Sequence, residues 1–146
     1  MSLIAKSPII VVEDSDEDFD TVIEAVAQAS IEAEVWRATT GEEFLALLRG
    51  VAAVTPAMVL LDLNTPGTDG REALAIMKSD PALCAVPVVV FSTSANPRDL
   101  DFCYRVGANA YHVKPIRHPD HLDAVIDIFR YWLGRVALQH SGRTVL

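Results

Sequence analysis

The stretch VLLDLNTPGTDG, residues 59–70, carries an apolar run straight into a carboxylate at Asp62 and then into a loop of Pro, Gly and Asp. Short apolar runs bounded by turn residues are typical of strands that are buried on both faces. In the loop, Pro66 stiffens the chain, while Gly67 and Gly70 let backbone come close to a bound group. The stretch therefore predicts a buried strand whose end presents Asp62 to a ligand.

The same alternation of short apolar runs and amphipathic patterns extends along most of the 146 residues. The apolar runs predict strands at residues 9–12, 33–38, 57–62, 86–91 and 110–113. The 3–4 spacing of apolar residues and the helix start signals predict helices at 16–30, 40–48, 69–79 and 97–107, and a last helix from Pro119. Five β-α repeats predict one α/β domain with a parallel sheet that is covered on both faces and doubly wound.

Polar residues follow the predicted strands at the edge where such a sheet binds its ligand. Glu13 and Asp14 follow the first strand, Asp62 the third, Ser92 the fourth and Lys114 the fifth. Each alone has an ordinary explanation, such as a helix start or a turn. Together, three repelling carboxylates favour a hard cation such as Mg²⁺, and the ammonium and hydroxyl favour a phosphoryl group. A carboxylate at the centre of such a site is a candidate phosphoryl acceptor.

Four segments, VVEDSDED, LLDLNTPGTDG, VVVFSTSA and GANAYHVKP, resemble the receiver domain of two-component response regulators, across residues 8–135. The acid pair, the D-x-x-x-P-x-x-D-G loop, the strand-end Ser and the K-P pair occur in the order and spacing of that family. The resemblance implies a flavodoxin-like α/β fold: an open doubly wound five-stranded parallel sheet of order 2-1-3-4-5, with five helices in three α/β/α layers. We expect a receiver domain at 8–138 and a C-terminal tail at 139–146.

The resemblance also assigns the metal and the acceptor. It implies that Asp62 is the phosphoacceptor and a metal ligand. Glu13 and Asp14 would hold Mg²⁺ together with Asp62 and the main-chain carbonyl of Asn64. Glu13 stands where Asp is also common, and we expect its longer side chain to reach the ion through water.

The remaining assignments concern the response to phosphorylation. The resemblance implies that Ser92 is the switch hydroxyl, that Lys114 pairs with the phosphoryl group and that Tyr111 is the aromatic residue that changes rotamer. It also implies a cis peptide bond before Pro115. Thr65 stands where Met or Leu is usual, and Thr93 where a smaller residue is frequent, so we expect a local packing change and narrower access, respectively.

The function implied is that of a single-domain response regulator, not an enzyme with a separate substrate. A sensor histidine kinase would supply the phosphoryl group in a Mg²⁺-dependent reaction, and the signal would pass through a changed protein-binding surface. The segments DLNTPGTDGREAL, FSTSANPRDL and YWL resemble more narrowly the regulators paired with bacterial phytochrome kinases. The alternative is a pseudo-receiver, a protein-interaction module that is not phosphorylated.

Two other classes fit less well. Phosphohydrolases with an aspartyl nucleophile resemble a D-x-D signature, whereas here Asn64 stands at the second acidic position. A flavodoxin-type cofactor binder needs a phosphate-binding loop after the first strand, where Glu13 and Asp14 would repel phosphate in the absence of a metal.

Composition limits partners and location. The net charge of −8 disfavours nucleic acid and anionic membranes as partners. Since there is no signal peptide and no long apolar run, we expect a cytoplasmic protein. Cys84 and Cys103 are then expected to be reduced core thiols. His118 and His121, an i, i+3 pair, are expected to be solvated surface residues rather than ligands.

The last helix is apolar around much of its girth. One stripe is expected to face the core: Leu122, Val125, Ile126, Phe129, Trp132, Leu133 and Val136. Ile128, Tyr131 and Leu138 lie partly off that stripe. We expect a homodimer whose face includes Ile128, Tyr131, Trp132 and Leu138. The alternative is that these are scattered apolar residues exposed to water.

Overall fold

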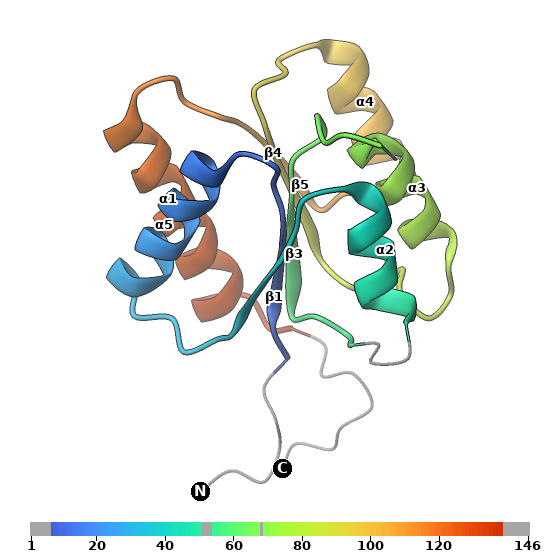
Figure 1. Cartoon of the computed structure of the whole chain (residues 1–146), viewed down its shortest axis with the longest axis horizontal. Coiled ribbons are helices and arrows are strands. Elements are labelled where there is room, and N and C mark those ends of the chain that lie inside the picture. Colours follow the sequence, from blue (N-terminus) through green and yellow to red (C-terminus); the bar gives the residue numbers. More distant parts are fainter. Residues whose placement is uncertain (1–6, 51–53, 68, 139–146) are drawn as a thin grey trace, which may run out of the picture.

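The computed structural model describes residues 7–50, 54–67 and 69–138, in which five strands alternate with five helices (Figure 1). The strands are β1 (Ile9–Val12), β2 (Val35–Ala38), β3 (Met58–Leu61), β4 (Val88–Ser92) and β5 (Ala110–Val113). The helices are α1 (Asp16–Gln28), α2 (Gly41–Arg49), α3 (Gly70–Ser79), α4 (Pro97–Val106) and α5 (His118–Gly134). The expected tail at 139–146 lies outside the described residues.

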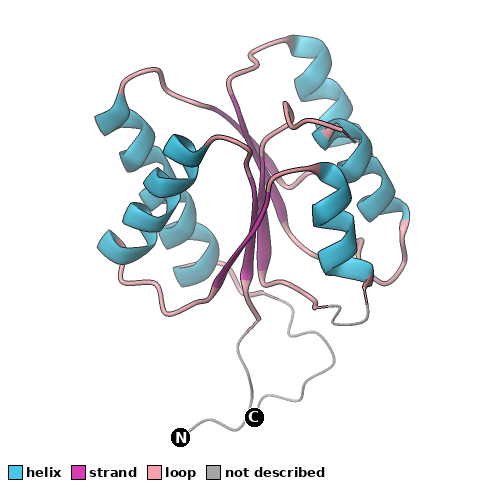
Figure 2. Cartoon of the chain, in the orientation of Figure 1, coloured by secondary structure: helices cyan, strands magenta, loops and turns pink. Residues whose placement is uncertain are grey.

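The five strands form one parallel sheet in the order β2-β1-β3-β4-β5. Helices α1 and α5 cover one face, and α2, α3 and α4 cover the other, as Figures 1 and 2 show. This arrangement confirms the predicted three-layer, doubly wound fold. It also brings the carboxyl ends of the parallel strands to one edge of the sheet.

Two hydrophobic cores lie on the two faces of the sheet. Along β1, Ile10 and Val12 join the core under α2 and α3, while Ile9 and Val11 join the core under α1 and α5. All four side chains are buried. Because successive side chains of a strand point to opposite faces, a run with no polar residue is what a sheet covered on both sides requires.

Most element boundaries lie within one or two residues of the sequence prediction, and two of the differences have a clear backbone cause. The helix predicted at 16–30 ends at Gln28, and Ser30 adopts a left-handed backbone with φ 56° that a helix cannot continue. The strand predicted at 86–91 begins at Val88, because Pro87 has no N–H to give to the sheet.

The helix ends follow the sequence signals closely. Thr40 caps α2 by accepting from the Glu43 N–H at 3.0 Å. The Glu43 carboxylate accepts from Thr39 rather than from Thr40, so the return hydrogen bond of a capping box is displaced by one residue. At α4, Asn96 accepts from the Arg98 N–H, and Gly107 ends the helix at φ 118°.

Three local expectations prove wrong. The described residues contain no cis peptide bond, so the bond before Pro115 is trans, the form that X–Pro bonds ordinarily favour. Both cysteines are free, but only Cys103 is buried; Cys84 is exposed because it lies in the turn between α3 and β4. His121 is buried, not solvated, because it faces the sheet and packs its ring 5.1 Å from that of Phe91.

The C-terminal helix α5 is only partly as expected. Ile128, predicted on the dimer face, is buried in the core beneath α1 and α5, so its place on that face is withdrawn. Trp132 is half-buried against the same core, and Leu138 is half-buried as well. Tyr131 is 57% exposed.

In the described part of the chain, no helix has the length and apolar character needed to cross a bilayer.

Candidate functional site

The carboxyl edge of the sheet gathers the polar residues that the sequence placed there. Glu13 and Asp14 follow β1, Asp62 follows β3, and Lys114 follows β5, while Ser92 is the last residue of β4. The Lys114 N–H donates to the Ser92 carbonyl at 2.7 Å, and the Asp62 N–H donates to the Val12 carbonyl at 3.0 Å. Strand pairing therefore fixes the backbone from which these side chains project.

Three carboxylates converge at this edge. Glu13, Asp14 and Asp62 each offer an oxygen atom, and these atoms lie within 4.8 Å of one another. Glu13 and Asp62 are buried, whereas Asp14 is exposed. Like charges this close repel, more so where burial excludes water. The hard oxygen donors and the net negative charge of the cluster fit a divalent cation such as Mg²⁺ or Mn²⁺.

Lys114 supplies the opposing charge and contacts three acids. Its Nζ lies 2.6 Å from Glu13 Oε1, 2.8 Å from Asp18 Oδ2 and 3.3 Å from Asp62 Oδ2. The Lys114 side chain is almost fully buried, at 4% exposure. Asp18 was not predicted to take part, because its place in the first turn of α1 is already explained by the helix dipole.

Burial and charge act on these groups in opposite directions. Burial raises the pKa of Glu13 to about 7, with a further contribution from Asp62, although Lys114 works against the rise. Burial alone would lower the pKa of Lys114, but the carboxylates of Glu13, Asp18 and Asp62 outweigh it and raise that pKa above its ordinary value. The ammonium is therefore a permanent positive charge at the site.

Arg37 connects the outer strand β2 to the first acid. Its Nε donates to the Glu13 carbonyl at 3.0 Å, and its Nη1 lies 2.8 Å from Asp16 Oδ1. The guanidinium also lies 4.7 Å from the centre of the Phe19 ring. These contacts fix the chain on both sides of Asp14, where β1 turns into α1.

The loop after β3 orients Asp62, whose side chain is only 10% exposed. The Asn64 N–H donates to Asp62 Oδ1 at 3.2 Å, which orients the carboxylate. Gly70 packs so closely beneath the loop that a Cβ there would lie 2.5 Å from the Asp62 carbonyl oxygen. Gly67 adopts φ 71°, a left-handed backbone that glycine accommodates without strain. Thr65 is buried, and its hydroxyl finds no hydrogen-bond partner among the described residues.

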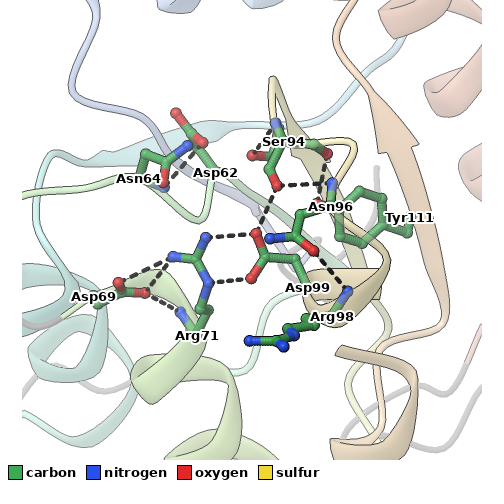
Figure 3. Close-up of polar contacts among 10 residues, drawn as sticks. Asp62, Asn64, Asp69, Arg71, Ser94, Asn96, Arg98, Asp99 and Tyr111 are labelled. Carbon is green, nitrogen blue, oxygen red and sulfur yellow. Dashed lines mark hydrogen bonds and ion pairs between the residues drawn. The ribbon is translucent and has the colours of Figure 1, made fainter. Parts of the chain in front are cut away.

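The loop after β4 links the predicted switch residues. Ser92 is fully buried, and its hydroxyl accepts from the Ser94 N–H at 3.2 Å. The Tyr111 hydroxyl donates to the Ser94 carbonyl at 2.8 Å (Figure 3). Burial raises the pKa of Tyr111, so this hydroxyl stays protonated and donates at neutral pH. Thr93, expected to narrow access to the site, is exposed.

A comparison of the sequence with family models identifies a family that is consistent with this fold and this edge geometry. The model of the response regulator receiver domain matches residues 9–127. The chain belongs to this family. The match includes every strand and all of the acidic edge.

Among curated proteins, two relatives of this receiver domain are informative. Response regulator Rcp1 of Synechocystis is 36% identical over 134 residues, which cover 89% of this chain and 91% of Rcp1. The probable methanogenesis regulatory protein FilR2 of Methanothrix harundinacea is 41% identical over 92 residues. That second match covers 63% of this chain and 59% of FilR2.

Solved structures give the same family. The phosphorylated cyanobacterial phytochrome response regulator RcpA is 37% identical, with a TM-score of 0.86 over 93% of this chain and 100% of RcpA. The Mn²⁺-bound form of Rcp1 is 36% identical, with a TM-score of 0.88 over 92% of this chain and 99% of Rcp1. The receiver domain described here therefore resembles phytochrome response regulators over nearly its whole length.

Proposed function

We propose that this receiver, with residues 8–138 as its domain, accepts a phosphoryl group on Asp62 from a sensor histidine kinase in a Mg²⁺-dependent reaction. The observation that supports this most directly is that the Asp62 carboxylate lies close to the carboxylates of Glu13 and Asp14 and also contacts the ammonium of Lys114. A lone buried carboxylate would be costly, whereas one held beside a cation-binding cluster and an ammonium is prepared for a dianionic group. The alternative, a pseudo-receiver, lacks a specific observation in its favour.

The chemistry assigns a role to each residue. Glu13, Asp14, Asp62 and the main-chain carbonyl of Asn64 would hold Mg²⁺, which supplies positive charge beside the phosphoryl oxygens. An Asp62 carboxylate oxygen attacks the phosphorus of the kinase phosphohistidine. The new O–P bond forms as the P–N bond breaks, and the electron pair returns to the imidazole nitrogen. Lys114 stabilises the charge of the transferring group from the other side.

Hydrolysis then returns the receiver to its starting state. A water molecule attacks the phosphorus of the acyl phosphate, the O–P bond to Asp62 breaks, and inorganic phosphate leaves. While the group is present, it adds a charge of about −1.5 to −2, by analogy with other protein phosphates. We propose that Ser92 turns toward it, that Tyr111 follows, and that a protein-binding surface changes as the population shifts between two states.

The proposal is tested by phosphorylation with labelled acetyl phosphate and Mg²⁺. We expect the wild type and Asp101→Asn, a matched control at a carboxylate that is 61% exposed on α4, to take up label. Asp62→Asn should take up none. Label on Asp62→Asn would show that another residue is the acceptor, and an unlabelled wild type would favour the pseudo-receiver.

The kinase is proposed to be of the phytochrome type. This rests on the likeness to the phytochrome response regulators RcpA and Rcp1. Phosphotransfer profiling against purified histidine kinases tests it: we expect a phytochrome kinase to transfer its label fastest. A faster transfer from an unrelated kinase would place this receiver in another pathway.

We further propose a homodimer through the C-terminal part of α5 and the residues that follow it, with Tyr131, Trp132 and Leu138 at its face. The exposed Tyr131 ring packs edge-on against Trp132, with centroids 5.7 Å apart, and gives this end an aromatic surface. Aromatic side chains are enriched at interfaces. Sedimentation that shows a monomer at high micromolar concentration, with and without a phosphoryl mimic, would contradict it.

A further inference from the structure

Arg71 joins the loop that follows Asp62 to the start of α4. Its Nε lies 2.6 Å from Asp99 Oδ1, and its Nη2 lies 2.8 Å from Asp99 Oδ2, so the two residues form a bidentate ion pair (Figure 3). Its Nη1 lies 3.0 Å from Asp69 Oδ2. Asp69 in turn caps α3 by accepting from the Arg71 N–H at 2.7 Å. One guanidinium therefore holds α3 and α4 together beside the phosphoacceptor loop.

Asp99 passes this restraint to the loop after β4. The Ser94 hydroxyl donates to Asp99 Oδ2 at 2.6 Å. The same hydroxyl accepts from the Asn96 N–H at 3.3 Å. Ser94 is thus held at three points, because its N–H bonds the Ser92 hydroxyl and its carbonyl accepts from Tyr111. Both predicted switch residues are tied to a single serine, whose position depends on Asp99.

The pairing between Arg71 and Asp99 is stronger than an ordinary surface ion pair. Their side chains are 28% and 15% exposed, and two parallel charge-assisted hydrogen bonds fix their geometry. Hydrogen bonds from Arg71 and Ser94 lower the pKa of Asp99 to about 2. The pair stays fully charged at neutral pH, so it acts as a permanent restraint.

We propose that Arg71 and Asp99 are positioning residues that form a latch, holding Ser94, and through it Ser92 and Tyr111, in the unphosphorylated arrangement. The latch deepens the proposed function and rests on it where phosphorylation is concerned. For Ser92 to turn toward a phosphoryl group on Asp62, the loop that carries Ser94 has to move. This movement has to break the contacts of the latch. The free energy needed to break them is subtracted from the free energy that the phosphoryl group gains in the activated arrangement.

The latch is tested by the affinity for beryllofluoride, a phosphoryl mimic, with Mg²⁺. Arg71→Gln and Asp99→Asn each remove the ion pair while keeping polar side chains. We expect both variants to bind the mimic more tightly by on the order of fivefold, the low end of coupling between linked sites. Since the two residues act as one unit, the double variant should bind no more tightly than either single variant.

Arg105→Gln is the matched control. Arg105 Nε pairs with Asp101 Oδ2 at 2.7 Å on α4, but at 77% and 61% exposure and away from Ser94. We expect its affinity for the mimic to equal that of the wild type. Unchanged or weaker binding in both latch variants would overturn the proposal, as would tighter binding in the control.

Hydrogen exchange of the unphosphorylated protein separates failure of the latch from failure of the proposed function. The latch predicts faster exchange at the Ser94 and Asn96 amides in Arg71→Gln and Asp99→Asn, and wild-type exchange in Arg105→Gln. Unchanged exchange at both amides rejects the latch, whatever the mimic does. If the wild type binds no mimic, the proposed phosphorylation fails, and exchange alone decides whether the latch exists.

Discussion

The ammonium of Lys114 lies 2.8 Å from the carboxylate of Asp18, closer than the 3.3 Å that separates it from Asp62. The first turn of α1 is thereby bonded to the end of β5. The proposed reaction requires Lys114 to face a phosphoryl group on Asp62. Asp18 therefore competes with Asp62 for the one ammonium that both contact.

Asp18→Asn should lower the free energy of unfolding by about 1 kcal/mol, since a charge-assisted hydrogen bond at a partly exposed carboxylate is weakened. Urea denaturation measures this, with Asp20→Asn, an exposed acid of the same helix, as control. Label from acetyl phosphate should still be taken up, because Asp62 and Lys114 are intact. Loss of labelling in Asp18→Asn would make Asp18 part of the reaction and contradict its role as competitor.

Gly70→Ala should destabilise the fold by about 1 to 3 kcal/mol, the usual cost of overpacking. The new Cβ would lie 2.5 Å from the Asp62 carbonyl oxygen and 2.7 Å from Leu63 Cα, both of them backbone atoms. Gly134→Ala at the end of α5 is the control, since a Cβ there meets nothing within 4 Å. In thermal melts, Gly70→Ala should have a lower melting temperature than Gly134→Ala. Equal melting temperatures would show that the loop can rearrange to accept the new methyl group at little cost.

Thr65→Val should stabilise the fold by about 1 kcal/mol. The Thr65 side chain is buried, and its hydroxyl lacks a partner among the described residues, so an apolar group of the same shape avoids the cost of removing a hydroxyl from water. Thr21→Val is the control, because the equally buried Thr21 hydroxyl donates to the Glu17 carbonyl at 3.1 Å. Urea denaturation should show a gain only at Thr65. A loss there would mean that the hydroxyl is bonded in solution.

His121 should make stability fall in mild acid. Burial lowers the pKa of His121 below its ordinary value of 6.5, with Asp18 working in the opposite direction. Below about pH 6.5 the unfolded chain binds a proton at this histidine that the folded chain does not, so the contribution of His121 to the free energy of unfolding decreases as the pH falls. Urea denaturation between pH 8 and 5 should show the wild type losing stability relative to His121→Gln, since the raised pKa of Glu13 acts in the opposite direction but equally in both proteins. His118→Gln, at a 63% exposed imidazole, should follow the wild type.

Most of the fold was accessible from the sequence because parallel strands buried on both faces carry an uninterrupted apolar signal. The convergence of Glu13, Asp62 and Lys114 followed from topology alone, since parallel strands bring their carboxyl ends to one edge. Their assigned roles stay predictions. Long-range pairs were not accessible: Arg71 and Asp99 are 28 positions apart, and no periodicity connects them.

Residues that serve two purposes were interpreted through only one of them. Because Asp18 is a typical residue for a helix start, the sequence pattern gave no indication that it also bonds Lys114. His121 and Ile128 lie beside polar neighbours on α5, and spacing alone did not reveal that both face inward. A helix between a sheet and a second helix buries a wider arc than a single stripe, as α5 does against the sheet and α1.

Arg37 lies on β2, an edge strand of the sheet, and donates to the Glu13 carbonyl. Edge strands open locally at a smaller free-energy cost than unfolding of the whole domain. Each such opening withdraws the guanidinium from the Glu13 carbonyl and frees the turn that carries Asp14. The proposed affinity of the acidic edge for a divalent cation would therefore depend on the local stability of this edge strand. Weakening β2 far from Asp62 should reduce that affinity while the melting temperature of the domain stays nearly the same.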